Sequence, residues 1–400
     1  MDKRTGADPL HVIAFNSGSS SLKFGLYDVR GERAVCLASG DAQQIGEARG
    51  AFRAVDGAGR VISEDTAPLP TPHDVVVRVG QWLSDIGAPP PQAIGHRVVH
   101  GGRALRRHCR IDDAVLRLLK AAQAFAPLHT PAVLSVIGSA QALFPGLPQV
   151  ACFDTVFHAC MPAVASVLPL PTALRAQGIQ RYGFHGLSCE SIVRQLAQAP
   201  ASQLPGRLLI AHLGNGASVT AVRNGVSIDT SMGLTPSGGL MMGTRSGDLD
   251  PGVLVYLARE QGFDANKLED LVDHHGGLAG ISGLDGDMRT LHAAAASNAD
   301  AALAIRMFCY AVRKQLAAMW AVLDGVDAIV FTGGIGEHDA VVRAEVCIGL
   351  SSLGVQLDEA RHRALANPIS SDRSSCLVHV LPSLEDEQIA RHTGALVVAS

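Results

Sequence analysis

Several features that would define a function class are missing from this 400-residue sequence. The 33 Lys and Arg residues are outnumbered by 37 Asp and Glu residues, so the net charge of −4 gives no indication of a nucleic-acid or anionic-membrane partner. No G-x-x-x-x-G-K-[ST] motif occurs, which excludes a P-loop as a phosphate site. Any binding of phosphate must therefore depend on local arrangements of residues.

Paired cysteines and a long apolar run are also missing. The eight cysteines form no C-x-x-C pair and no metal-ligand spacing, so we expect buried or free thiols in a reducing compartment, the cytoplasm. The most apolar helical stretch, residues 301–323, contains Arg306, Arg313 and Lys314 and is expected to be a core helix rather than a membrane span. Residues 1–10 lack the apolar core of a secretory signal and are expected to form a frayed tail. The cysteines are Cys36, Cys109, Cys152, Cys160, Cys189, Cys309, Cys347 and Cys376.

Length and composition predict two globular domains, because 400 residues with 47% hydrophobic and 18% charged residues exceed the usual size of a single core. Strand-like runs at 11–18 and 22–29 form one hairpin candidate, and residues 208–229 form another. The pair Asn224-Gly225 is a strong two-residue hairpin signal. Two such units about two hundred residues apart indicate a duplicated α/β domain, although the two segments do not align well enough to prove a repeat.

Three glycine-rich turns follow predicted strands. "FNSGSSSLKF" places Gly18 and three serines before Lys23, and "HLGNGASV" begins at His212. The third turn, in "VFTGGIGEH", ends the apolar strand predicted in "DAIVFTGGIGEH", residues 327–338. Turn amides beside a lysine suit an anion, yet each turn alone is explained as well by a plain hairpin or a β-bulge. The occurrence of three such turns in one α/β chain favours a nucleotide site.

Charged residues occur beside these turns. The long aperiodic segment 230–252 contains Arg245, and "GHRVVHGG" ends a strand with Arg97, whose planar guanidinium suits a carboxylate or phosphate. A surface ion pair is the simpler explanation for either arginine. Asp154 and His185 have similar alternatives, a turn cap and a buried core histidine. A helix is predicted after "PLHTP", with Thr130 as its cap and an end at Pro145-Gly146.

Taken together, these stretches resemble the acetate kinase family. The motifs occur in order from about Val12 to Arg391, and they are long enough to be specific. They are "NSGSSSLK", "GHRVVHGG", "FDTVFH", "RYGFHG", "HLGNG", "SMGLTP", "MGTRSGD", "GISG" with "DMR", and "FTGGIGE".

The resemblance implies a duplicated α/β fold of the actin, hexokinase and Hsp70 type with an active-site cleft between two domains. Residues 11–150 with 385–400 would form the first domain, and residues 151–384 the second, with the nucleotide site and a homodimer interface. The implied reaction transfers the γ-phosphoryl group of ATP to acetate with Mg²⁺, or Mn²⁺ in its place. The other implied properties are a cytoplasmic location and an absence of nucleic-acid and membrane partners.

The resemblance also assigns roles to individual residues. It implies that Asn16 and Glu385 contact the metal, that Lys23 contacts phosphate, and that Arg97 binds the substrate carboxylate. His185 and Arg245 would stabilise the transition state, and Asp154 matches a residue usually regarded as a proton donor or acceptor. The implied nucleotide contacts are His212, Leu213, Gly214, Asn215, Gly216, Asp287, Met288, Arg289, Gly334, Ile335, Gly336, Glu337 and His338, and the implied pocket for the methyl group of the acid is Val99, Leu128, Phe184 and Pro236.

The chemistry of phosphoryl transfer to a carboxylate modifies the role assigned to Asp154. A carboxylate substrate is already ionised near pH 7 and needs no general base, so we interpret Asp154 as an orienter of the metal, its water or an arginine. The positions that depart from the usual pattern bear on substrate size and nucleotide preference rather than on reaction class. They are Thr130, Leu187, Cys189, Ser237, Gly238 and His338.

Two other functions remain open at this stage. A kinase for propionate or butyrate would share the phosphate-binding residues and differ only in the acid pocket. A non-catalytic ATP-driven switch would need the three glycine turns but would give no reason for Arg97, His185 and Arg245.

Overall fold

The computed structural model describes residues 8–18, 20–127, 129–198 and 204–399. The chain divides into two compact units, residues 1–156 with 384–400 and residues 157–383. Ser19, Leu128 and residues 1–7 of the expected tail lie outside the described residues. Within the described part of the chain, no helix is long and apolar enough to cross a membrane.

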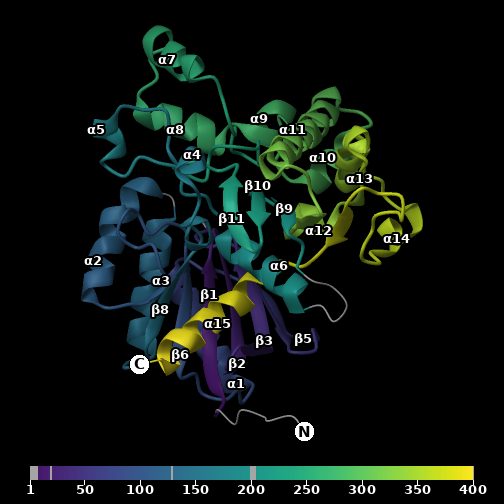
Figure 1. Ribbon diagram of the computed structural model, residues 1–400. Coiled ribbons are helices and arrows are strands. Elements are labelled where there is room, and N and C mark those ends of the chain that lie inside the picture. Colours follow the sequence, from purple (N-terminus) through teal and green to yellow (C-terminus); the bar gives the residue numbers. More distant parts are fainter. Residues whose placement is uncertain (1–7, 19, 128, 199–203, 400) are drawn as a thin grey trace. The chain divides into compact units, whose positions relative to one another are not determined.

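The first unit is built on one mixed sheet in the order β5-β4-β3-β2-β1-β6-β8-β7 (Figure 1). Strands β1 to β5 form an antiparallel meander, whereas β1, β6 and β8 run parallel. The strands are β1 (Leu10–Ser17), β2 (Ser21–Arg30), β3 (Arg33–Gln43), β4 (Gly50–Asp56), β5 (Val61–Ala67), β6 (Ala93–Val98), β7 (Cys109–Arg110) and β8 (Gln149–Phe153).

Helices cover both faces of this sheet. Helices α1 (Pro72–Asp85) and α3 (Thr130–Leu143) pack on the face that carries Ile13 and Phe15, and α2 (Asp113–Ala121) lies beside α3. Helix α15 (Glu385–Val398) packs on the opposite face, against β1, β2, β6 and β8. Gly95 permits this close approach, because a Cβ atom there would lie 2.2 Å from Thr393 Oγ1. The buried side chains on both faces stabilise the unit by about 1.5–3 kcal/mol for each large apolar residue.

The second unit is built on a five-stranded sheet in the order β11-β10-β9-β12-β13. Its strands are β9 (Arg207–Leu213), β10 (Ala217–Arg223), β11 (Val226–Thr230), β12 (Ala328–Thr332) and β13 (Leu377–Val380). Helix α6 (Gly186–Gln198) packs on one face, while α11 (Ala299–Leu323) contacts β9 and β10. The other helices are α4 (Ala163–Ser166), α5 (Thr172–Arg175), α7 (Pro251–Glu260), α8 (Ala265–His274), α9 (Gly277–Ser282), α10 (Met288–Ala294), α12 (Gly333–His338), α13 (Ala340–Ile348) and α14 (Glu359–Ala364).

The two sheets share one strand pattern. In each, three antiparallel strands (β3-β2-β1 and β11-β10-β9) are followed across the sheet by two strands parallel to the last of the three (β6-β8 and β12-β13). The duplication hypothesised from two strand-turn-strand segments therefore extends to the strand order. The predicted hairpin at 224–225 is confirmed: β10 and β11 pair antiparallel, and Asn224 and Gly225 have φ of 50° and 81°, as a two-residue turn of this type requires.

Two details differ from the expectations. A boundary after residue 150 would cut β8, which pairs with β6, so the first unit extends to 156 and includes Asp154. Thr130 is the first residue of α3 and is buried; the capping position is His129, and no side-chain cap is formed there.

Candidate active site

In the first unit, the candidate residues lie at the carboxyl ends of three neighbouring parallel strands. Asn16 is near the end of β1, Arg97 near the end of β6, and Asp154 directly after β8. Side chains alternate along a strand, so Asn16 and Arg97 share the face of Ala14 and Gly95, the face on which α15 packs. This arrangement brings all three side chains to the first turn of α15, where Glu385 begins the helix.

A continuous hydrogen-bond network joins these residues. The Nδ2 atom of Asn16 donates to Glu385 Oε2 at 2.9 Å and to Asp386 Oδ1 at 2.8 Å, and its Oδ1 accepts from Arg97 Nη1 at 3.1 Å. Arg97 also donates through Nε and Nη2 to Asp154 Oδ2, at 2.9 and 2.6 Å. The carboxamide of Asn16 is thereby fixed with its nitrogen toward the carboxylates and its oxygen toward the arginine.

The network is buried and strongly charged. Asp154 has a fully buried side chain, and that of Arg97 is 16% exposed. The pKa of Arg97 is raised, because the charges of Asp154 and Glu385 outweigh the burial that would lower it. Burial raises the pKa of Asp386, although its hydrogen bond from Asn16 and the charge of Lys23 act in the opposite direction. Asp154 thus contacts Arg97 directly, and the contact agrees with the interpretation of Asp154 as an orienter of an arginine.

Lys23 and Asp386 complete this cluster in different ways. Lys23 is exposed on β2 directly opposite Asn16 in the antiparallel register. Asp386 was missed by the sequence reasoning, although it holds Asn16 as closely as Glu385 does. The signal that could have identified it is a second acid next to Glu385 at the start of an amphipathic helix, where carboxylates are favoured by the helix dipole.

In the second unit, the candidate residues again follow parallel strands. Residues 212–216 end β9, residues 333–338 follow β12, and Ser383 follows β13. His212 lies on the face of the sheet covered by α6, and Ser218 is its partner in the register of β9 and β10. The first turn of α6 therefore lies over the end of β9.

His185 and Arg245 converge beside the turn at Gly216. A Cβ atom at Gly216 would lie 3.1 Å from His185 Nε2 and 3.6 Å from Arg245 Nη1, so a larger residue would intrude between them. His185 has a left-handed backbone, with φ of 57°, and is 7% exposed. Its Nδ1 lies 2.9 Å from Ser218 Oγ, and its ring stacks on that of His212 with centroids 4.1 Å apart. Strained backbone of this kind concentrates at functional sites.

The remaining predicted nucleotide residues differ in environment. Asp287 caps α10 and also binds the guanidinium of Arg289, whose side chain is 91% exposed. Gly334 is exposed, and no atom lies within 4 Å of where its Cβ would be. Glu337 accepts from the backbone N–H of Gly333 at 2.9 Å, which fixes the start of α12. Leu213 and Gly336 are buried, whereas Asn215 and His338 are exposed.

The predicted acid-pocket residues divide between the two units. Val99 belongs to the first unit, and Phe184 and Pro236 belong to the second; all three are buried. Leu128 lies outside the described residues. The pocket accordingly remains a prediction.

Two of the departures from the usual family pattern have structural roles. Cys189 is fully buried in the core between α6 and the second sheet, with its Sγ 3.7 Å from Thr220 Oγ1. Ser237 donates a hydrogen bond to Asp273 of α8. Neither contact involves His185, whose Nδ1 is within hydrogen-bond distance of Ser218 instead.

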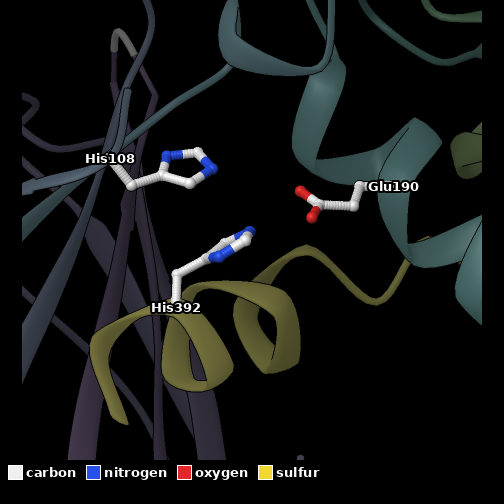
Figure 2. A group of neighbouring side chains, drawn as sticks. All are labelled: His108, Glu190 and His392. Atoms are coloured by element: carbon white, nitrogen blue, oxygen red, sulfur yellow. The ribbon is translucent and has the colours of Figure 1, made fainter. Parts of the chain in front are cut away.

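A second histidine pair lies in the first unit. Figure 2 shows His108 and His392, with ring centroids 3.9 Å apart; Glu190, also labelled, belongs to the second unit. The N–H of Phe153 donates to His108 Nδ1 at 3.0 Å, so neutral His108 carries its proton on Nε2 and does not offer that atom to a metal. Burial and the neighbouring His392 lower the pKa of His108 to about 3. The pair is therefore a packed ring contact in which His108 is neutral.

Cationic side chains and turn amides at the carboxyl ends of parallel strands suit phosphate groups, and both units provide such a place. The fold and site define a kinase of the actin, hexokinase and Hsp70 type, in which phosphoryl transfer depends on positioning and charge.

Comparison with known proteins agrees with a kinase of this type and identifies the family within it. Residues 11–391 match the model of the acetokinase family, and the chain belongs to that family. The chain is similar to the acetate kinases of Methylocella silvestris (42% identity; 96% of this chain and 98% of that protein covered) and Rhodopseudomonas palustris (41%; 96% and 98%). Among solved structures, it is similar to a propionate kinase from Francisella tularensis (TM-score 0.89, 36% identity; 97% and 100% covered) and to Porphyromonas gingivalis acetate kinase (TM-score 0.85, 33%; 97% and 100%).

Proposed function

We propose that this chain transfers the γ-phosphoryl group of ATP to acetate, giving acetyl phosphate and ADP, in a reversible reaction that requires Mg²⁺. In the forward direction a carboxylate oxygen of acetate bonds to the γ-phosphorus, and the bond from phosphorus to the β,γ-bridging oxygen breaks. The observation that carries the proposal is the Asn16–Arg97–Asp154 network, which presents a fixed guanidinium and oxygen ligands at the end of the first sheet.

Arg97 is proposed to bind the acetate carboxylate. A guanidinium has five N–H donors, and the described contacts to Asp154 and Asn16 hold it through both sides of its fork. Asp154 fixes the plane of the guanidinium and balances its charge inside the protein. Because acetate is ionised near pH 7, Asp154 has no proton to remove, which supports the orienting role.

Asn16 and Glu385 are proposed to hold the divalent metal. Their carbonyl and carboxylate oxygens are the hard ligands that Mg²⁺ prefers, and Mg²⁺ usually takes only one or two carboxylates together with phosphate oxygens. The donor types therefore fit the ion, and Mn²⁺ fits the same ligands. Because Asn16 Oδ1 accepts from Arg97 Nη1 and its Nδ2 faces Glu385, Glu385 would bind the ion directly and Asn16 would contact it through a water molecule. When bound, the metal would neutralise charge on the phosphate oxygens.

The second unit is proposed to bind ATP and to stabilise the charge that develops during transfer. The turns at 214–216 and 333–336 offer backbone amides at the ends of β9 and β12. His185 and Arg245 meet beside the first of these turns, where they would donate to the oxygens of the transferring phosphoryl group. Lys23 of the first unit would add charge toward the same phosphates.

A homodimer in the cytoplasm is also proposed. Helix α7 contains no buried residue and exposes Val253, Val255 and Tyr256, and α11 exposes Met307 and Tyr310 beside a cavity of about 560 Å³. Apolar side chains exposed on these helices support the proposal of a second copy of the chain as their cover. Light scattering should give twice the chain mass, and Val255→Glu with Tyr310→Glu should give the monomer. The eight cysteines, all among the described residues, form no disulfide, which agrees with a reducing compartment.

Propionate is the second candidate substrate, because the chain resembles the propionate kinase structure as well as the acetate kinases. The test is an assay with ATP, Mg²⁺ and hydroxylamine across acids of two to four carbons. Acetate should give the highest kcat/KM for acyl hydroxamate, and no product should form without a divalent metal. A higher kcat/KM for propionate than for acetate would make propionate the substrate. If none of the acids gives a hydroxamate, the proposed reaction is refuted.

A further inference from the structure

A chain of hydroxyl groups lies behind His212 in the second unit. Ser383 Oγ donates to Ser188 Oγ at 3.0 Å, and Ser188 Oγ lies 2.8 Å from His212 Nδ1. Ser188 is fully buried in the first turn of α6, so its hydroxyl has no access to bulk water. These three side chains come from the segment after β13, from α6 and from the end of β9.

The other ring nitrogen of His212 lies beside the two glycine turns. Its Nε2 would be 3.2 Å from a Cβ atom at Gly333 and 3.9 Å from one at Gly214. Both turns belong to the proposed nucleotide site. Whether Nε2 carries a proton or a lone pair therefore decides whether this ring attracts or repels a phosphate oxygen.

The hydroxyl chain positions the proton of the neutral His212 ring. Each serine hydroxyl has one hydrogen, and Ser383 uses its hydrogen on Ser188. Ser188 already accepts from Ser383, and its own hydrogen is available to His212 Nδ1 at 2.8 Å. In the arrangement in which every hydroxyl donates along this chain, Nδ1 accepts and the neutral imidazole carries its proton on Nε2.

We propose that Ser188 and Ser383 are positioning residues that hold His212 as the Nε2–H tautomer, so that His212 donates to a phosphate oxygen of the bound nucleoside polyphosphate. This inference rests on the proposed nucleotide site and adds to it the residues that set the proton on His212.

The same chain connects the turns to each other. The backbone N–H of Ser383 donates to Glu337 Oε1 at 3.0 Å, and this oxygen also accepts from Gly333 N–H at 2.9 Å. His212 in turn stacks on His185, at a centroid distance of 4.1 Å. The ends of β9, β12 and β13 are thereby held together through one carboxylate and two hydroxyls.

The test compares Ser188→Ala with a matched control in the same helix. Ser191 is equally buried, but its hydroxyl donates to the carbonyl of Ser188 at 2.7 Å and does not contact His212. Ser188→Ala should raise the KM for ATP and the Kd for MgADP by roughly 2-fold to 5-fold, because only the fraction of His212 that carries its proton on Nε2 remains competent to donate. The KM for acetate should change less than about 1.5-fold, which corresponds to about 0.2 kcal/mol at 25 °C.

Further variants separate positioning from packing. Ser188→Thr retains the hydroxyl and should recover most of the affinity for ATP, and Ser383→Ala should show a smaller increase in KM than Ser188→Ala. Ser191→Ala should keep the KM for ATP of the wild type. If Ser188→Ala and Ser191→Ala give the same KM for ATP, the hydroxyl chain has no positioning role and the proposal is refuted.

The tautomer itself is measured by NMR on protein labelled with ¹⁵N and ¹³C in histidine, with the signals of His212 assigned from a His212→Gln variant. Without nucleotide, the wild type should show the proton on Nε2, and Ser188→Ala should show a mixture of tautomers. A proton on Nδ1 in the wild type would refute the proposal. An unchanged KM for ATP in His212→Gln would instead contradict the nucleotide site, and the tautomer would still be decided by the spectrum.

Discussion

Replacing Arg97 should have two separable effects, one on stability and one on turnover. Arg97→Ala leaves Asp154, whose side chain is fully buried, without its cationic partner. Removing one member of a buried ion pair typically costs about 3–5 kcal/mol of stability. Removal of a donor to the reacting groups should also lower turnover by roughly 10²-fold to 10³-fold. The variant should therefore fold at low temperature, but with reduced stability and little activity.

The stability effect can be followed in the first unit alone. The chain has two tryptophans, Trp82 in the first unit and Trp320 in the second, so a Trp320→Phe background reports unfolding of the first unit through Trp82 fluorescence. In this background, Arg97→Ala should lower the urea midpoint. Adding Asp154→Asn should recover part of the lost stability, because the uncompensated charge is removed, while turnover stays low.

Arg97→Lys is the matched control for charge. It keeps the positive charge and loses the planar fork that contacts Asp154 through two nitrogens. It should be more stable than Arg97→Ala and still impaired in turnover. If Arg97→Ala has the stability and kinetics of the wild type, the assignment of this cluster is wrong. If the double variant is no more stable than Arg97→Ala, the buried charge of Asp154 is not the cause of the loss.

Three further predictions concern other parts of the molecule. Arg245→Ala should lower turnover by roughly 10²-fold to 10³-fold, because its Nη1 lies beside His185 at the turn of Gly216, where it would stabilise the charge of the transferring phosphoryl group. Steady-state kinetics check this, and wild-type turnover would contradict its role. Gly95→Ala should lower the free energy of unfolding by about 1–3 kcal/mol, because the new Cβ would meet Thr393 Oγ1. A variant as stable as the wild type would show that α15 packs less closely on the sheet than described. Burial lowers the pKa of both His96 and His158 to about 4, below the ordinary 6.5. The contribution of the two neutral rings to stability is therefore complete above pH 6.5 and is lost as the pH falls toward 4. Urea midpoints that do not fall over this pH range would refute this prediction.

Much of the fold could be predicted from local signals. The Asn224-Gly225 pair defined a hairpin because both positions need a positive φ, and the charges at 306, 313 and 314 identified α11 as a soluble core helix. The cap at Thr130 could not be located as well, since a helix can begin one residue earlier without a side-chain cap. The boundary at 150 failed because parallel pairing of β8 with β6 is a long-range contact that local sequence does not show.

The candidate site also divides into residues that could be predicted from motifs and contacts that could not. Arg97 and Asp154 were identified as candidates from their motifs, but their direct contact depends on the register of β6 and β8. Asp386 was missed because an acid at the start of a helix is common and is explained by the helix dipole alone. The link from Ser188 to His212 joins residues 24 positions apart and depends on which face of β9 the helix covers. Such contacts follow from packing and cannot be obtained from spacing.

The position of α15 has a consequence for how the protein is made. The helix completes the first unit, yet it is synthesised only after residues 157–383 of the second unit. At a synthesis rate of about 5–20 residues per second, the face of β1 and β6 that carries Asn16 and Gly95 waits roughly 10–45 s on the ribosome for its cover. During that interval the nascent first unit leaves this face of its sheet uncovered, and we expect chaperones to bind it until α15 emerges.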